Sequence, residues 1–156
     1  MTGLETHPLR SCEIFIDENA DWFHRGNRIF RPEILEVLYS RLDRLPAGQF
    51  VLADETGICL LDTADTPYVV SRVDRKESPS GEEWIALGLK NLPQTEALDP
   101  GTLLVGKDNV LYCRVIGGRF PARFSRPAYY QIAEFLQEDA SGFYIELNGC
   151  RYFVAM

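Results

Sequence analysis

Short stretches in which hydrophobic and polar positions alternate or cluster cover most of the chain, and they predict a protein rich in β-strands. Residues 12–17 and 22–25 flank a polar turn, which is the pattern of a β-hairpin. Residues 50–52 and 58–61 flank a second turn that ends at Gly57, and they predict a second hairpin. We therefore expect at least two hairpins in the first half of the chain.

Between these hairpins, apolar residues recur at the spacing of a helix. They are Ile34, Leu35, Leu38, Leu42 and Leu45. Pro32 suits the first turn of a helix, because the N–H group that proline lacks would have no partner there, and the Pro-Ala-Gly sequence at 46–48 ends the pattern. The spacing predicts an amphipathic helix of about three turns over residues 33–45.

The second half of the chain repeats this order of elements. A hairpin pattern at 103–115 is followed by an Arg-Pro pair, a helical pattern at 129–136 and another hairpin at 143–154. The pairs Arg31-Pro32 and Arg126-Pro127 are 95 residues apart. This periodicity indicates an internal repeat.

The expected fold is α+β, with two similar hairpin, helix, hairpin repeats packed into one compact unit. The expected divisions are an N-terminal tail at 1–12, a first β-β-α-β-β repeat at 13–73, a connecting hairpin and loop at 74–101, and a second repeat at 102–156.

Charge and cysteine content narrow the classes of partner. The chain has 16 basic and 23 acidic residues, a net charge of −7, so we expect neither a nucleic-acid nor a membrane partner. No cysteine spacing suits a metal and no glycine-rich phosphate loop is present, so neither a metal nor a cofactor is expected. We interpret the four cysteines as free, mostly buried thiols rather than disulfides. Together with an N-terminus unlike a signal peptide, this predicts a cytoplasmic protein.

Several segments resemble a known bacterial family. The sequence Asp-Trp-Phe-His-Arg-Gly at 21–26, the sequence Asp-Thr-Pro-Tyr-Val-Val at 65–70 and the sequence Ala-Arg-Phe-Ser-Arg-Pro-Ala-Tyr-Tyr at 122–130 are similar to segments of the family called domain of unknown function 1285. The chain departs from that family at 53–57. The resemblance implies an α+β fold with repeated motifs, no established activity, and a suggested role in signal transduction.

Arginine is the residue type that points to a site. Thirteen of the sixteen basic residues are arginine, and two groups of them precede the two predicted helices. Planar guanidinium groups beside a helix start favour a carboxylate or a phosphate. The candidate ligand-binding residues are Trp22, His24, Arg28, Arg31, Arg119, Arg123 and Arg126. The alternative is that these arginines pair with surface acids and that the neighbouring aromatic residues pack the core.

The favoured interpretation is a non-enzymatic binding module, related to signalling, that recognises a small acidic ligand or a protein partner. One alternative is a small hydrolase or transferase that uses His24 with Cys113 or an acidic residue. Another is a structural interaction subunit, a homo-oligomer included, whose apolar strand edges pair with a second copy. Converging arginines would favour the first interpretation, and a nucleophile or carboxylate beside His24 would favour the second.

Overall fold

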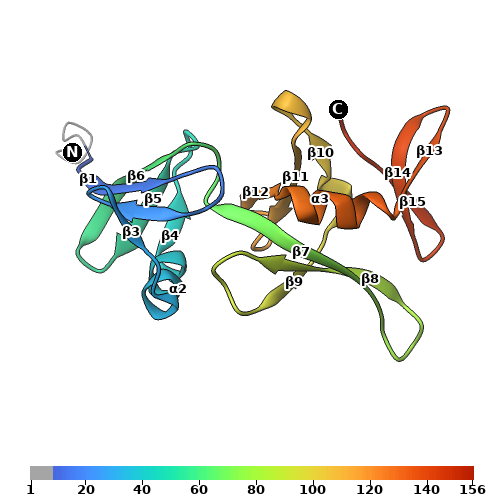
Figure 1. Ribbon diagram of the computed structural model, residues 1–156, viewed down its shortest axis with the longest axis horizontal. Coiled ribbons are helices and arrows are strands. Elements are labelled where there is room, and N and C mark those ends of the chain that lie inside the picture. Colours follow the sequence, from blue (N-terminus) through green and yellow to red (C-terminus); the bar gives the residue numbers. More distant parts are fainter. Residues whose placement is uncertain (1–8) are drawn as a thin grey trace. The chain divides into compact units, whose positions relative to one another are not determined.

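The computed structural model describes residues 9–156, in which strands far outnumber helices (Figure 1). Internal contacts divide the chain into two compact units, Met1–Pro67 and Tyr68–Met156. The expectation of a single compact unit is therefore wrong. The boundary between the units lies after Pro67 rather than after residue 73. Strand β7 is continuous over Tyr68–Glu77 and pairs with strands of the second unit.

The first unit is a six-stranded sheet with the order β3-β2-β1-β6-β5-β4. Its strands are β1 (Ser11–Ile16), β2 (Trp22–His24), β3 (Asn27–Ile29), β4 (Leu42–Arg44), β5 (Phe50–Asp54) and β6 (Gly57–Thr63). Strands β1–β3 and β4–β6 are two antiparallel meanders. They join in the middle of the sheet, where β1 and β6 are parallel.

Helix α2 (Pro32–Ser40) connects the two meanders and is shorter than the sequence predicted. Leu42, which fits the helical spacing, instead begins β4 and pairs with Leu52. The buried face of the helix carries Tyr39, whose ring lies 5.0 Å from that of Trp22. The indole N–H of Trp22 donates to the Tyr39 hydroxyl at 3.1 Å. This contact fixes the helix against the fully buried Trp22 of β2.

A disulfide between Cys12 and Cys59 links β1 to β6. The two Cα atoms lie 5.1 Å apart because the parallel pairing brings these strands together. The expectation of free thiols is therefore wrong for this pair. Cys150 is a free thiol, but it is exposed rather than buried. Since disulfides persist in oxidising compartments, the predicted cytoplasmic location loses the support it drew from the cysteines.

The second unit has a six-stranded sheet with the order β10-β11-β12-β7-β8-β9 and a separate sheet β13-β14-β15. The strands after β7 are β8 (Glu83–Leu89), β9 (Thr95–Ala97), β10 (Leu104–Val105), β11 (Leu111–Val115), β12 (Phe120–Phe124), β13 (Leu136–Asp139), β14 (Gly142–Leu147) and β15 (Cys150–Phe153). The expected connecting segment at 74–101 thus supplies strands of the main sheet. In its middle, β12 and β7 are parallel.

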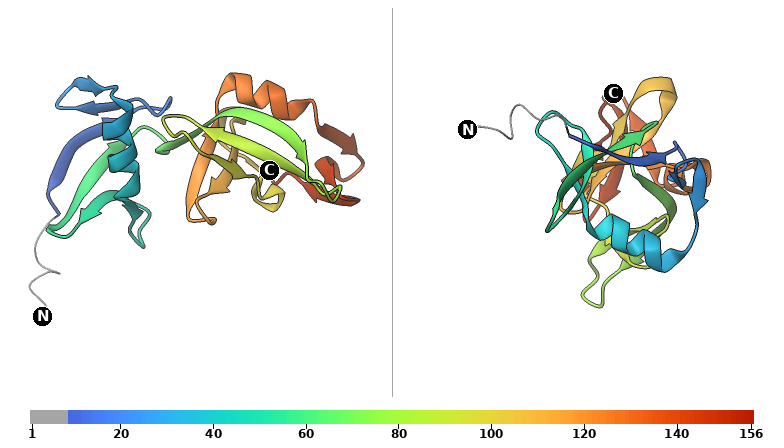
Figure 2. Two further views of the ribbon diagram at one scale, coloured as in Figure 1. Left: turned by 90° about the horizontal axis from the view of Figure 1, so that it is seen from below. Right: turned by 90° about the vertical axis from the view of Figure 1, so that its left-hand side faces the viewer.

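Helix α3 (Arg126–Ala133) follows β12 and lies beside β7 (Figure 2). The side-chain oxygen of Gln131 accepts a hydrogen bond from the backbone N–H of Val73 at 2.7 Å. The predicted helical segment, 129–136, extends past the C-terminal end of the helix. Leu136 instead begins β13, where it pairs with Ile145. Buried Ala128 and Ile132 face the sheet.

The order meander, Arg-Pro helix, meander occurs in both halves of the chain, with three-stranded meanders in place of the expected hairpins. Strands β1–β3, helix α2 and strands β4–β6 correspond to strands β10–β12, helix α3 and strands β13–β15. The first and last strands of the first copy pair in parallel. In the second copy a single parallel bridge, Leu104 to Ala155, occupies the same place. These pairings support the repeat that the sequence indicated.

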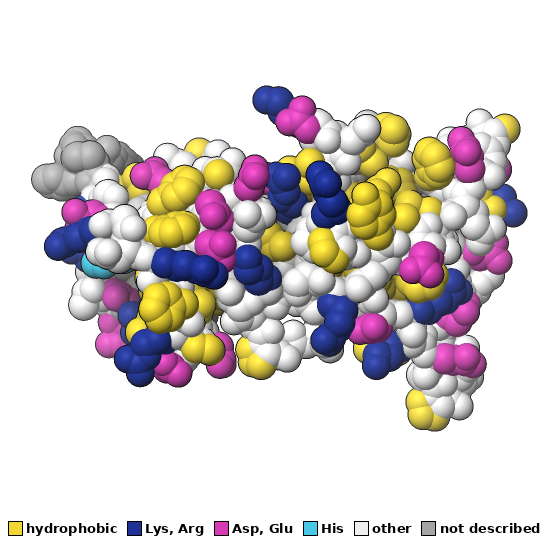
Figure 3. Space-filling view, viewed as in Figure 1, with side chains coloured by type: hydrophobic (Ala, Val, Ile, Leu, Met, Phe, Trp, Pro, Cys, Tyr) yellow, Lys and Arg dark blue, Asp and Glu magenta, His cyan; other side chains and the backbone are white. Residues whose placement is uncertain are grey.

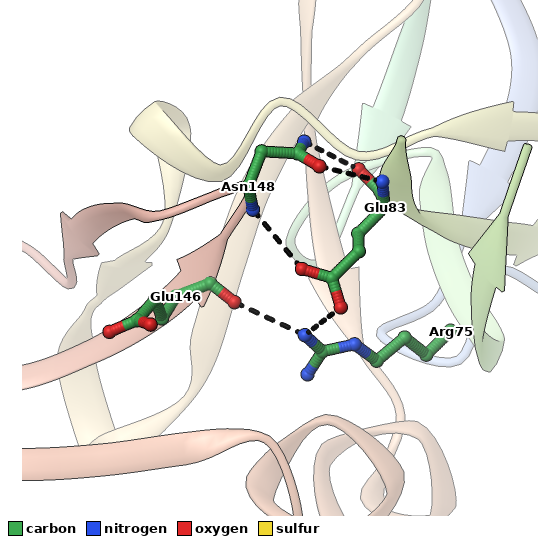
Figure 4. Close-up of polar contacts among 4 residues, drawn as sticks. All are labelled: Arg75, Glu83, Glu146 and Asn148. Atoms are coloured by element: carbon green, nitrogen blue, oxygen red, sulfur yellow. Dashed lines mark hydrogen bonds and ion pairs between the residues drawn. The ribbon is translucent and has the colours of Figure 1, made fainter. Parts of the chain in front are cut away.

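The turn between β14 and β15 is bonded to the beginning of β8 (Figure 4). Asn148 and Glu83 exchange three hydrogen bonds, and Arg75 donates to the Glu83 carboxylate at 2.8 Å. Arg75 also donates to the Glu146 carbonyl at 3.3 Å. This polar joint fixes the small sheet to the β7–β8 hairpin.

Candidate functional site

Three arginines of the first unit, Arg25, Arg28 and Arg31, are paired with acidic neighbours. The ion pairs are Arg25–Glu13 at 2.7 Å, Arg28–Asp21 at 3.0 Å and Arg31–Glu33 at 2.8 Å. Each guanidinium therefore already faces a carboxylate. The two candidate residues Arg28 and Arg31 match the alternative interpretation, in which arginines pair with surface acids.

The other two candidates of the first unit do not form a pocket with these arginines. Trp22 is fully buried and belongs to the contact between β2 and α2. His24 is exposed at the end of β2, where it pairs with Ile14 and Asn27 in the strand register. A wide hollow of about 760 Å³ near Arg25 is lined by three carboxylates, Glu13, Asp17 and Asp62. Its acidic lining does not suit an anion.

The second unit places Arg123 and Arg126 on one pocket of about 390 Å³. Arg123 comes from β12 and Arg126 begins α3. The aromatic walls are Tyr129 and Tyr130, whose rings are 5.8 Å apart. The remaining lining residues are Asp108, Asn109, Val110, Leu111 and Phe124. Figure 3 shows basic side chains next to hydrophobic ones over β12 and the beginning of α3.

Arg126 is available to a ligand. Within residues 9–156 its guanidinium makes no ion pair and no side-chain hydrogen bond, and the residue is exposed. Arg119 differs, because its guanidinium lies 5.1 Å from the centre of the Phe120 ring and does not line this pocket. Of the seven predicted residues, the structure thus brings together Arg123 and Arg126.

The backbone groups at the beginning of α3 are largely satisfied already. Ser125 accepts a hydrogen bond from the Ala128 N–H through its hydroxyl, at 3.3 Å, and one from the Tyr129 N–H through its carbonyl, at 2.8 Å. Pro127 has no N–H to offer. The binding capacity of the pocket therefore lies in its side chains.

A short loop supplies another part of the pocket lining. The 3-10 turn η2 (Lys107–Asn109) joins β10 to β11, and its residues Asp108 and Asn109 have φ values of 58° and 61°. Aspartate and asparagine adopt this left-handed conformation more readily than most residues. Gly106 precedes the turn and lies so near Tyr112 that an added Cβ would be 2.9 Å from the ring. We expected a hairpin turn here but did not assign its residues to the site.

The geometry around Cys113 does not suit a nucleophile. Its thiol is buried in β11, and this burial, together with the nearby carboxylates of Glu96 and Asp99, raises its pKa to about 12. The thiol is therefore protonated at neutral pH, whereas the thiolate is the reactive form. His24 belongs to the first unit and Cys113 to the second.

The described residues also bear on metal binding and on membrane insertion. In residues 9–156, no three or more histidine, cysteine, aspartate or glutamate side chains are grouped as metal ligands would be. In the same residues, neither helix has the length and apolar character that crossing a membrane requires.

Comparisons with known proteins identify the fold. No family model and no curated protein matches the sequence. A crystal structure of a DUF1285 family protein from Silicibacter pomeroyi DSS-3 superimposes with a TM-score of 0.77 at 15% identity, over 99% of this chain and 87% of that one. Another, from Shewanella baltica OS155, gives 0.63 at 13% identity, over 78% and 90%. The chain therefore has the fold of these DUF1285 family proteins, as the resemblance in its sequence predicted.

Proposed function

We propose that the protein is a binding module that holds a small acidic ligand in the second-unit pocket formed by Arg123, Arg126, Tyr129 and Tyr130. We call this the arginine pocket. The observation that carries the proposal is the free guanidinium of Arg126 on a pocket that Arg123 also lines. An arginine fork donates two parallel hydrogen bonds to a carboxylate or phosphate and keeps its charge at any physiological pH.

The volume of the arginine pocket and the residues that line it support the binding of a small ligand. A volume of about 390 Å³ lies within the usual range of small-molecule sites, about 300–1,000 Å³. The tyrosines offer apolar ring faces together with hydroxyl donors, and Tyr129 and Tyr130 are 40% and 61% exposed. Exposed rings of this size beside an unpaired cation favour contact with a ligand.

The charges that line the pocket also favour an anion. Among the charged residues that line the pocket, two are arginines and one, Asp108, is acidic, and the guanidinium of Arg126 has no acidic partner within residues 9–156. Arg25, Arg28 and Arg31 of the first unit differ from Arg126, because each of them is paired with an acid. The ligand module is therefore proposed for the second unit alone. The version of the enzymatic alternative that uses Cys113 is set aside, because its thiol is buried and protonated.

A thermal-shift experiment with matched variants tests the proposal. The probes are benzoate, citrate and inorganic phosphate, added to the wild type, to Arg126→Ala and to Arg31→Ala. Arg31 is the matched control, since it also precedes a proline at a helix start but is paired with Glu33. We expect at least one probe to raise the melting temperature of the wild type and of Arg31→Ala but not of Arg126→Ala. An equal shift in all three proteins would contradict the proposed site.

A further inference from the structure

A second cavity adjoins the arginine pocket within the second unit. It has a volume of about 450 Å³ and shares Asn109, Leu111 and Tyr129 with the arginine pocket. Its other lining residues are Val105, Leu136, Phe143, Val154 and Met156. We call it the apolar cavity, because within its lining only Asn109 and the Tyr129 hydroxyl carry polar side-chain groups.

The lining of the apolar cavity is held in place by backbone hydrogen bonds. Val154 donates its N–H to the Phe143 carbonyl at 2.9 Å, next to the β14–β15 pairing. The N–H of Val105 donates to the Ala155 carbonyl at 2.8 Å, and the Ala155 N–H donates to the Leu103 carbonyl at 3.0 Å. These bonds fix the segment after β15 alongside β10, so that Val105 and Val154 face the same cavity.

Some of this apolar surface remains exposed to water. Phe143 is 45% exposed and Tyr129, which both spaces share, is 40% exposed. Exposed large hydrophobic side chains are common singly, but a group of them around a concave surface marks a binding site. Here that surface is continuous with one that carries two guanidinium groups.

From this juxtaposition we infer that the ligand is an amphipathic acid, with its anionic group at Arg126 and its apolar chain in the apolar cavity. The inference rests on the proposed function and names its ligand class. The arginine pocket supplies the charge complement, and the shared lining residues Leu111 and Tyr129 place the charged part next to the apolar part. A small, fully polar anion would leave the apolar cavity exposed to water.

A chain-length series tests the inference on the intact protein. The probes are butanoate, hexanoate, octanoate and decanoate, with decanol as the uncharged counterpart, and binding is measured by calorimetry below the concentrations at which they form micelles. Each CH₂ group that enters the apolar cavity should lower Kd by up to about fourfold. Decanoate should therefore bind much more tightly than butanoate, and decanol more weakly than decanoate.

Two pairs of variants locate the two ends of the ligand. Phe143→Ala should weaken decanoate binding by about tenfold, whereas Phe153→Ala should not change it. Phe153 is the matched control because it is similarly exposed, at 43%, and lies outside both linings. Arg126→Ala should abolish the preference for decanoate over decanol, and Arg31→Ala should keep it.

The outcomes separate the inference from the proposed function. If butanoate and decanoate bind equally and both depend on Arg126, the amphipathic ligand is overturned while the acidic-ligand module stands. If decanoate binding depends on Phe143 but not on Arg126, the arginine pocket is overturned. If no probe of the series binds to the wild type, the inference is overturned, and the short anions of the thermal-shift experiment still test the module.

Discussion

Asn148 and Glu83 are joined by three hydrogen bonds in which the side chain of each residue meets the backbone of the other (Figure 4). The Asn148 amide accepts from the Glu83 N–H at 2.7 Å and donates to the Glu83 carbonyl at 2.9 Å. The Glu83 carboxylate accepts from the Asn148 N–H at 3.1 Å. Asn148 directly follows β14, the strand that carries Phe143 of the apolar cavity.

Substitution of Asn148 should weaken the second unit. Asn148→Ala loses both amide hydrogen bonds and places alanine at a φ of 53°, so the free energy of unfolding should fall by about 2–3 kcal/mol. Asn148→Gly loses the same bonds but tolerates the positive φ, and it should cost about 1–2 kcal/mol. Urea unfolding followed by tryptophan fluorescence and circular dichroism measures both. A glycine variant as stable as the wild type would show that the amide bonds contribute nothing.

The thiol content can be counted with a thiol-reactive chromophore. Since Cys12 and Cys59 form a disulfide, Cys113 is buried and Cys150 is exposed, the native protein should react rapidly at one cysteine. The denatured protein should react at two, and the denatured and reduced protein at all four. Reduction should also lower the free energy of unfolding by about 2–4 kcal/mol. Four reactive thiols before reduction would contradict the disulfide.

The half-buried Glu96 should make stability depend on pH. Burial raises its pKa, although the hydrogen bond from the Ile116 N–H acts in the opposite direction. The folded state therefore binds a proton more readily than the unfolded state, so stability should fall as pH rises from the ordinary glutamate pKa through the raised folded value. Both carboxylate oxygens lie near the Ile116 N–H, at 2.8 and 3.0 Å.

Glu96→Gln keeps an acceptor for Ile116 and removes the ionisation. Urea unfolding across the acidic range should therefore show a smaller loss of stability with rising pH in this variant than in the wild type. Glu83 has the opposite sign, because hydrogen bonds from Asn148 and Arg75 lower its pKa. Its contribution should be lost as pH falls through that lowered value. Identical pH profiles for the wild type and Glu96→Gln would exclude the role of Glu96.

Removal of the one carboxylate in the arginine pocket should strengthen anion binding. Asp108→Asn keeps the side-chain shape, and asparagine also tolerates the φ of 58°. With the like charge gone, the Kd for an anionic probe should fall by about two- to tenfold at low salt, and the gain should shrink as salt screens it. Calorimetry with the probe that stabilises the wild type measures this. A weaker affinity would show that Asp108 positions an arginine.

Local sequence patterns predicted the beginnings of the helices well, because a single residue type marks them. The Arg-Pro pairs mark the beginnings of both helices because proline is compatible with the first turn. Helix ends were less accurate, since Leu42 and Leu136 continue the helical spacing yet lie in strands. Their partners, Leu52 and Ile145, are brought alongside by the tertiary fold.

Long-range pairing accounts for what the sequence could not predict. The disulfide depends on the parallel contact of β1 with β6, which joins residues 47 positions apart. The division into two units depends on β7, which follows the first repeat along the chain but pairs with β12 and β8 of the second unit. At the site, clustering of arginines indicated Arg123 and Arg126 together with Arg28 and Arg31. The clustering alone did not show that Arg28 and Arg31 are paired with Asp21 and Glu33.

The most direct test of the arginine pocket is to map where an acidic ligand binds. Backbone amide resonances of the protein would be followed by NMR during titration with octanoate. We predict that the shifts concentrate at residues 108–111 and 123–130, and that they disappear in Arg126→Ala. Shifts centred on the first-unit arginines, or the same shifts in Arg126→Ala, would contradict it.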